Sequence, residues 1–212
     1  MREIIRNIYR MTHIENIPHI LKYGLTHRSS GNADPHYHSI GDASLIDYRS
    51  SKMVDVGGIM IALGDYIPFY FGVRMPMLYV IQHGGNYVPD VVDLQNIVYV
   101  VVSIEKLVQD ENIVCYFSDG HATDSFTSFY TKQDICRLSS ILDQDAIRAR
   151  QWSGENIDRD LKRRKQAEFL VGNDIPASYI IGFVCYNEEA KIRLMEWNIS
   201  GDKIKVVPQA YY

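Results

Sequence analysis

Apolar and polar positions change their spacing twice within the first 25 residues. Residues 4–11 alternate, which is typical of a strand. Thr12 and Glu15 then have the spacing of a capping box. Apolar side chains follow at helical spacing, at Ile14, Ile17, Ile20 and Leu21, until Gly24. The pattern predicts a strand over Ile4–Met11 and a helix that begins after Thr12 and ends at Gly24, because glycine is the usual helix-terminating residue.

The remaining apolar runs are short and rich in β-branched residues. We expect strands at 54–63, 77–81, 97–104, 115–117, 168–171, 179–185 and 203–207. Helices are expected after Ser103 and over Asn187–Trp197, with Asn187 as N-cap. Residues 27–51 are predicted as a polar loop that ends near 46–49, residues 64–71 as a compact aromatic cluster, and residues 126–164 as helical segments mixed with loops. Short strands with irregularly placed helices predict a single α+β domain over residues 1–212.

Composition places the chain among ordinary globular proteins. It has 212 residues, of which 46% are hydrophobic and 23% charged. The apolar runs are shorter than the roughly 18 residues of a membrane span, and the first residues lack the pattern of a secretion signal. The three cysteines are widely spaced and form no CxxC pair, so neither a zinc site nor a disulfide framework is indicated. We expect a cytoplasmic protein without membrane contact.

Charge is unevenly distributed along the chain. The net charge of −4 argues against a protein that coats nucleic acid indiscriminately. Residues 148–165 nevertheless carry seven basic side chains against three acidic ones. Such a run is either a solvated helix face or a local nucleic-acid contact. The 15 tyrosines add aromatic rings that can stack on bases, although many must belong to the core.

Several common catalytic motifs are missing from the sequence. No GxGxxG follows a predicted strand, and neither a P-loop nor a GxSxG turn is present. Rossmann, P-loop and α/β-hydrolase interpretations therefore have no support. Asp34, His36 and His38 lie close together, but such residues in a polar loop usually bind nothing, so we expect no metal.

Glu168 is the acidic residue with the most informative context. It follows the basic run that ends at Lys165 and opens the apolar strand expected over residues 168–171. One interpretation is a glutamate at a strand edge that pairs with Arg164 or Lys165, a contact that contributes little. The other is a carboxylate beside a bound polyanion, where it would stabilise a cationic transition state.

Three segments, in order along the chain, resemble the DarT family of DNA ADP-ribosyltransferase toxins from DarT–DarG systems. They are Thr12–Leu21 with Gly24-Leu25, then Gly64–Phe71 with Arg74–Tyr79, and finally Lys165–Val171. The resemblance implies an ADP-ribosyltransferase fold, in which a split pair of small β-sheets holds NAD⁺ in a cleft among flanking helices. It also implies transfer of ADP-ribose from NAD⁺ to a base, most often thymine, in single-stranded DNA.

The same resemblance implies roles for individual residues. Glu168 matches the catalytic glutamate, and Arg49 matches the arginine near the reacting base. His13, with Thr12 beside it, matches the histidine that contacts NAD⁺, and Gly24 matches a glycine near the bound nucleotide. Tyr70 and Met77 match residues of the nicotinamide pocket, and alternation along 69–71 predicts that Tyr70 faces the cleft while the two phenylalanines are buried.

The basic and aromatic residues of the second half are candidates to bind the DNA strand. They are His121, Arg148, Arg150, Trp152, Arg163 and Arg164. A toxin of this kind implies a partner antitoxin, a DarG-like macrodomain protein that removes the modification. Two alternatives stay open: the same fold acting on guanine, RNA or protein, and a non-catalytic binder of single strands.

Overall fold

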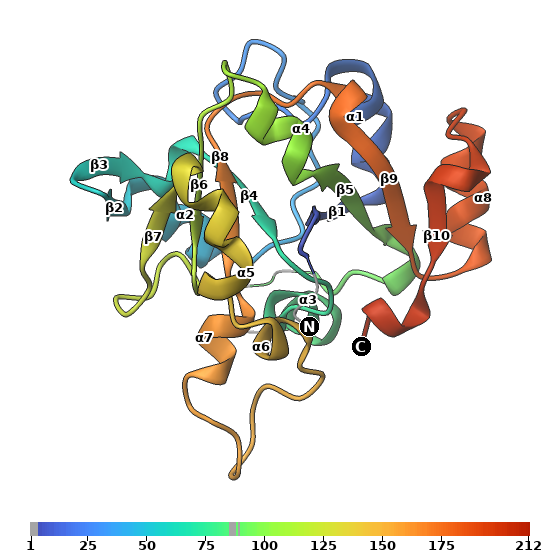
Figure 1. Cartoon of the computed structure of the whole chain (residues 1–212). Helices are drawn as coiled ribbons and strands as arrows, with labels where there is room; N and C mark the ends of the chain where they lie inside the picture. The colour runs from blue at the N-terminus through green and yellow to red at the C-terminus, as the bar shows by residue number, and fades with distance from the viewer. Residues whose placement is uncertain (1–3, 85–87, 89) are drawn as a thin grey trace.

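The fold is built on one large sheet and a small hairpin (Figure 1). The structure is a computed structural model that describes residues 4–84, 88 and 90–212. Eight strands lie in the order β10-β9-β5-β1-β4-β8-β6-β7. Their bounds are β1 Asn7–His13, β4 Ile67–Tyr70, β5 Ile97–Ser103, β6 Cys115–Ser118, β7 Phe129–Thr131, β8 Glu168–Val171, β9 Ile180–Cys185 and β10 Ile204–Val206. The hairpin pairs β2 (Met53–Val56) with β3 (Ile59–Ala62).

Short helices surround the sheet at irregular places along the chain. They are α1 Ile17–Tyr23, α2 Ala43–Ser51, α3 Pro76–His83, α4 Ile104–Gln109, α5 Leu138–Ile141, α6 Gln144–Arg148, α7 Leu161–Lys165 and α8 Glu188–Glu196. In Figure 1, α8 lies beside β10, whereas α5, α6 and α7 gather near the other half of the sheet. This arrangement confirms the predicted α+β class. Within the described residues, no helix has the length and apolar character needed to cross a membrane.

The sheet consists of two four-stranded halves that meet at a narrow contact. Strand β1 pairs with β5 along its whole length, from Asn7 opposite Ser103 to His13 opposite Ile97. Its pairing with β4 is reduced to Tyr9 opposite Tyr70. We call this contact the β1–β4 junction. It corresponds to the split sheet that the sequence led us to expect, and residues of both strands line two cavities beside it.

The centre of each half is strongly apolar. In β5 the residues from Ile97 to Val102 are all buried, and β8 is buried along its full length. Glu168 is therefore a carboxylate at the start of an otherwise apolar strand, with only 1% of its surface exposed. A charge in such a place needs a partner.

Two predicted strands are wrong. Residues 77–81 belong to helix α3, in which Pro76 occupies the first turn and Leu78 and Ile81 are buried three residues apart. Proline is well suited to the first helical turn because its missing N–H is not needed there. Residues 54–63 form the β2–β3 hairpin instead of one strand, because Gly57 and Gly58 adopt positive φ angles of 62° and 89° and reverse the chain.

Two boundaries also differ from the prediction. Strand β1 continues through Thr12, which is buried, so the side chain of His13 and not Thr12 caps the following turn by accepting from Glu15 N. The expected loop over 27–51 contains helix α2, whose N-cap is Asp42. None of the α2 residues is buried, which explains why its apolar periodicity is weak. The expected cluster at 64–71 contains strand β4, whereas the N-cap at Asn187 is confirmed.

Candidate active site

Strands β4 and β8 place Tyr70 and Glu168 directly opposite each other. Phe69 and Phe71, on either side of Tyr70, are buried with exposures of 0% and 5%. Tyr70 instead points to the other face of the strand and lines a cavity, as alternation predicted.

This cavity, which we call the Glu168 cleft, has a volume of about 360 Å³. Helix α2 contributes Arg49, helix α3 contributes Met77, and the loop after β6 contributes His121. A neighbouring cavity of about 190 Å³ extends the cleft. The two share Arg10, Thr26, His27, Arg28 and Tyr37 as wall residues. Together they form a largely apolar space with a few polar groups and one carboxylate in its wall, which is typical of a ligand site.

Glu168 and Arg49 form a buried two-point ion pair across the cleft wall. Arg49 Nη1 donates to Glu168 Oε1 at 3.1 Å, and Nη2 lies 2.9 Å from Oε2. Oε1 also accepts from the backbone N–H of Ala122 at 2.9 Å, and the hydroxyl of Ser118 accepts from Glu168 N. Oε2 has no hydrogen-bond partner of proper geometry among the described residues. The carboxylate is held rigidly, and one of its oxygens can still accept a hydrogen bond.

Burial and the Glu168–Arg49 pair shift the pKa values of three cleft residues. Burial lowers the pKa of Arg49, but the adjacent Glu168 carboxylate outweighs it, so the net shift is upward and the guanidinium stays charged. Burial raises the pKa of Tyr70 far above its usual range, with Glu168 adding to the effect, so its hydroxyl stays neutral. Burial lowers the pKa of His121 despite the nearby carboxylate, so its ring is mostly neutral near pH 7.

The loop that carries His121 is fastened to α7. His121 N donates to Arg163 O at 3.0 Å, and the hydroxyl of Thr127 donates to His121 O. The ring Nδ1 lies 2.7 Å from the hydroxyl of Thr123. Arg163 itself forms ion pairs with Asp119 and Asp160. The loop is therefore positioned by the same basic segment that precedes Glu168.

The three N-terminal candidates lie beside the cleft and do not line its wall. His13 stacks on His38 with ring centroids 5.0 Å apart, and burial lowers its pKa. Thr12 is fully buried and accepts from Asn16 Nδ2 at 2.8 Å. Gly24 ends α1 at φ 84°, and a Cβ there would lie 2.0 Å from the carbonyl oxygen of Ile175. Only glycine fits this close approach.

The basic candidates divide into two groups. Arg163 and Arg164 are engaged in ion pairs, the latter with Asp143, Asp158 and Asp160. Trp152 packs edge-on against Tyr79 and donates to the Tyr212 hydroxyl at 2.6 Å. Arg148 and Arg150 line a different cavity from that of Glu168. The structure thus does not bring the six predicted DNA-contacting residues to one groove.

Sequence reasoning missed the part of the cleft wall that comes from residues 26–46. Arg28, Tyr37 and Leu45 line the cleft, and His27 Nε2 lies 2.7 Å from the carbonyl oxygen of Gly64. These residues were assigned to a polar loop. The one local signal was Asp42, whose side chain accepts from Leu45 N as a helix N-cap.

A split sheet, a cleft at its junction and a buried glutamate opposite a tyrosine fit the ADP-ribosyltransferase class that the three sequence segments indicated. Solved structures agree with this class. The chain matches the DarT of Thermus sp. 2.9 in complex with ADP-ribosylated single-stranded DNA, with a TM-score of 0.82, 26% identity and full coverage of both chains. The same protein in complex with NAD⁺ matches with a TM-score of 0.77, 25% identity and full coverage of both chains.

The particular family follows from the sequence comparisons. Residues 9–212 match the family described as ssDNA thymidine ADP-ribosyltransferase, DarT, and the chain belongs to this family. A DNA ADP-ribosyl transferase of Escherichia coli O127:H6 is 32% identical over 90% of this chain and 84% of its own length. The chain also covers 48% of a Thermosipho africanus protein, 28% identical over 96% of this chain, named as a fusion of DNA ADP-ribosyl transferase and DNA ADP-ribosyl glycohydrolase. The family and enzyme class expected from the three segments are confirmed.

Proposed function

We propose that the Glu168 cleft transfers ADP-ribose from NAD⁺ to a thymine of single-stranded DNA, with Glu168 and Arg49 as its catalytic pair. The observation that carries this assignment is the buried two-point contact between these side chains, 2.9 and 3.1 Å long, in the wall of an apolar cleft opposite Tyr70. A charge pair of this kind costs desolvation energy, and such costs are typical of functional sites.

The residues of the cleft fit NAD⁺ as a substrate. Oε2 of Glu168 lies 2.9 Å from Arg49 Nη2 but has no partner of hydrogen-bond geometry among the described residues, and a ribose hydroxyl is a suitable donor for it. Tyr70 and Met77 supply the flat and apolar surfaces that a nicotinamide ring needs. His13, Thr12 and Gly24 do not line the cleft. They fix the turn after β1 and the end of α1, and the nucleotide lies against these two segments.

The chemistry follows from charge. Cleavage of the bond between nicotinamide and ribose leaves a positive charge on the sugar, which the fixed Glu168 carboxylate stabilises without reorganisation. The accepting ring nitrogen of thymine loses a proton as its bond to the sugar forms. Arg49 stays protonated and stabilises the negative charge that develops on the base. His121, in the same wall and mostly neutral near pH 7, contacts the base; His121, Glu168 and water are the candidates to accept its proton.

The phosphates of the strand require cations within reach of them. Arg163 and Arg164 are held in ion pairs with aspartates, so their role in our proposal is to hold the loop of His121 in place. Arg148 and Arg150, which are exposed, and Trp152 farther along the chain are our candidates to contact the phosphates and bases of the strand.

A partner is proposed from the chemistry of the product. An enzyme that modifies bases of its own cell's DNA acts as a toxin, so we infer an antitoxin of the macrodomain class that removes ADP-ribose. The Thermosipho africanus relative, named as a fusion of a transferase and a glycohydrolase, supports this pairing.

The test is mass spectrometry of thymine-containing single-stranded oligonucleotides after incubation with NAD⁺ and the protein. An adduct with the mass of ADP-ribose is expected with the wild type and is lost with Glu168→Gln. Glu188→Gln, at an exposed glutamate of α8, is the matched control and keeps full activity. Well-folded wild-type protein that forms no adduct on any oligonucleotide, or adducts only on RNA or protein, would contradict the proposal.

A further inference from the structure

Residues 27–42, which we call the wall segment, form one side of the Glu168 cleft without belonging to the sheet. All of them are described, they include no helix or strand, and none before Ile40 is buried. Tyr37, Ser39 and Ile40 are among the residues that line the cleft. A segment with so little buried apolar surface opens locally at small cost. The contacts that hold it therefore decide how well the cleft receives a nucleotide.

The side chain of Asn16 holds the main chain of the wall segment at two points. Its Nδ2 donates to His38 O at 2.9 Å, and its Oδ1 accepts from His38 N at 2.8 Å. The amide thus pairs with His38 as a residue of a neighbouring strand would. Because His38 lies between Tyr37 and Ser39, which line the cleft, this contact sets the position of the main chain there.

Asn16 is in turn anchored to the sheet. Only 1% of its surface is exposed, and its Nδ2 also donates to the hydroxyl of Thr12 at 2.8 Å. The same hydroxyl lies 3.4 Å from that of Tyr37. Thr12 belongs to β1, which pairs with β5 along its whole length, so it is held firmly. Asn16 therefore connects an exposed segment to a rigid part of the fold.

Other contacts hold the first half of the wall segment. The carboxylate of Asp174 accepts from the backbone N–H of His27 at 2.7 Å and from the hydroxyl of Ser30. The Nε2 of His19 lies 2.8 Å from the carbonyl oxygen of Asn32. These contacts fix the beginning of the segment, whereas Asn16 holds the stretch 37–42, most of which lines the cleft. Loss of the Asn16 amide should therefore free this stretch without detaching the whole segment.

We propose that Asn16 is a positioning residue for the transfer reaction: through the main chain of His38 it keeps residues 37–42 in the position that binds NAD⁺. A protein whose binding wall is in place for only a fraction of the time binds its ligand more weakly by that fraction. The reacting groups do not depend on Asn16, since Glu168 and Arg49 hold each other at two points. The inference rests on the proposed function, because it takes NAD⁺ to occupy the Glu168 cleft.

Isothermal titration calorimetry with a non-hydrolysable NAD⁺ analogue measures this effect without catalysis. In Asn16→Ala we expect the Kd to rise by about tenfold, because two hydrogen bonds to the wall segment are lost. Asn187→Ala is the matched control. The Oδ1 of Asn187 accepts from Ala190 N at 2.9 Å as the N-cap of α8, so this variant loses a similar bond away from the cleft and keeps the wild-type Kd. A Kd of Asn16→Ala within about twofold of the wild type would overturn the proposal.

Steady-state kinetics separate positioning from a general loss of stability. In Asn16→Ala the KM for NAD⁺ should rise by about tenfold, while the KM for the acceptor strand and kcat at saturating NAD⁺ change by less than about threefold. Bound NAD⁺ restores the wall, so the occupied enzyme reacts at nearly the wild-type rate. Equal increases in both KM values, or a fall in kcat of the same size, would overturn the proposal, because Asn16 would then support the fold as a whole.

Hydrogen–deuterium exchange tests the wall segment in the wild type, so it does not depend on a variant that folds. Peptides that cover residues 37–42 should exchange more slowly once the analogue is bound, and peptides around Asn187 should not change. Unchanged exchange over residues 37–42 would overturn the inference. Absence of adducts on every strand would contradict the proposed function, while calorimetry and exchange would still decide on Asn16. An analogue that does not bind the wild type would overturn both.

Discussion

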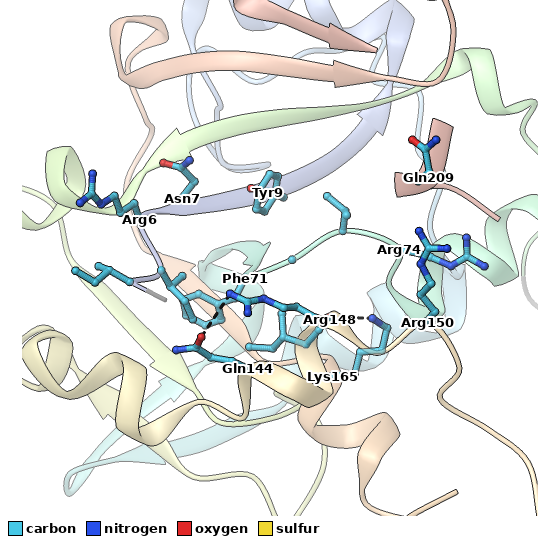
Figure 2. A pocket seen from close by; sticks show the side chains of 15 residues that line it. Arg6, Asn7, Tyr9, Phe71, Arg74, Gln144, Arg148, Arg150, Lys165 and Gln209 are labelled. Carbon is cyan, nitrogen blue, oxygen red and sulfur yellow. Dashed lines mark hydrogen bonds between the residues drawn. The ribbon is translucent and has the colours of Figure 1, made fainter. Parts of the chain in front are cut away.

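The walls of two cavities beside the β1–β4 junction differ in charge. One is the Glu168 cleft, and the other is a cavity of about 710 Å³, the basic cavity, lined by Arg6, Arg74, Arg148, Arg150 and Lys165 (Figure 2). In the Glu168 cleft the buried carboxylate is matched by Arg49 at two points, so the site is close to neutral before any ligand enters. The basic cavity gathers five cations, and its described wall contains no carboxylate. A matched pair is suited to stabilise charges that appear during a reaction, whereas a cluster of cations is suited to bind a ligand that is already charged.

The same contrast exists within the basic run of residues 148–165. Arg163 and Arg164 are neutralised by aspartates and fasten α7 to its surroundings. Arg150 is exposed and lines the basic cavity. Residues of one type and one stretch of sequence therefore serve two purposes, and only their neighbours in space distinguish structural arginines from binding ones.

The largest expected effect is on catalysis in the Glu168 cleft. Glu168→Gln keeps the size of the side chain but removes the charge that offsets the sugar cation. We expect the rate of ADP-ribose transfer to fall by about 10²–10³-fold or more. Single-turnover kinetics by mass spectrometry measure the rate, and circular dichroism checks the fold. A decrease below tenfold would show that Glu168 is a structural residue and would remove the contrast between the cavities.

Breaking the matched pair should also affect stability. Arg49→Met leaves the buried Glu168 carboxylate without its cation, and we expect the free energy of unfolding to fall by about 3–5 kcal/mol. Glu168→Leu/Arg49→Met removes both charges and should recover much of that loss. Urea unfolding of the two single variants and the double variant measures the coupling. Additive losses would show that the pair does not act as a unit.

Arg163 provides a test of the structural arginines. Its guanidinium donates to Asp160 and Asp119, and 13% of the side chain is exposed. Arg163→Gln should lower the free energy of unfolding by about 1–3 kcal/mol, since it leaves partly buried carboxylates unpaired. The salt dependence of strand binding should stay that of the wild type. A shallower slope, without loss of stability, would place Arg163 among the DNA-contacting residues instead.

The smallest expected effect concerns Lys165 and pH. Its pKa of about 8 in the folded protein lies below the ordinary value of 10.5, so the unfolded chain binds more protons between these limits. The stability of the wild type should therefore rise, relative to Lys165→Met, as pH increases from about 8 towards 10.5. Below pH 8 the difference between the two proteins should be constant. Unfolding curves at several pH values measure it, and a flat difference throughout would show that Lys165 titrates normally.

The sequence by itself determined the elements with strong local signals. Strand β8 follows from a continuous apolar run, and the start of α8 follows from the N-cap at Asn187. The burial of Phe69 and Phe71 around Tyr70 follows from alternation alone. The importance of Glu168 came from resemblance to a family, because its local context allowed a simple surface ion pair as well. Helix α2 was missed because none of its residues is buried, so it carries little apolar periodicity.

Tertiary structure alone decided which charges meet. Arg49 and Glu168 are 119 positions apart, and no spacing rule relates them. Arg6, Arg74 and Lys165 come from three separate regions and meet in the basic cavity because β1 and β4 pair at a single position and then diverge. Secondary structure is encoded within a few residues, whereas electrostatic pairing depends on distances in space that fold topology sets.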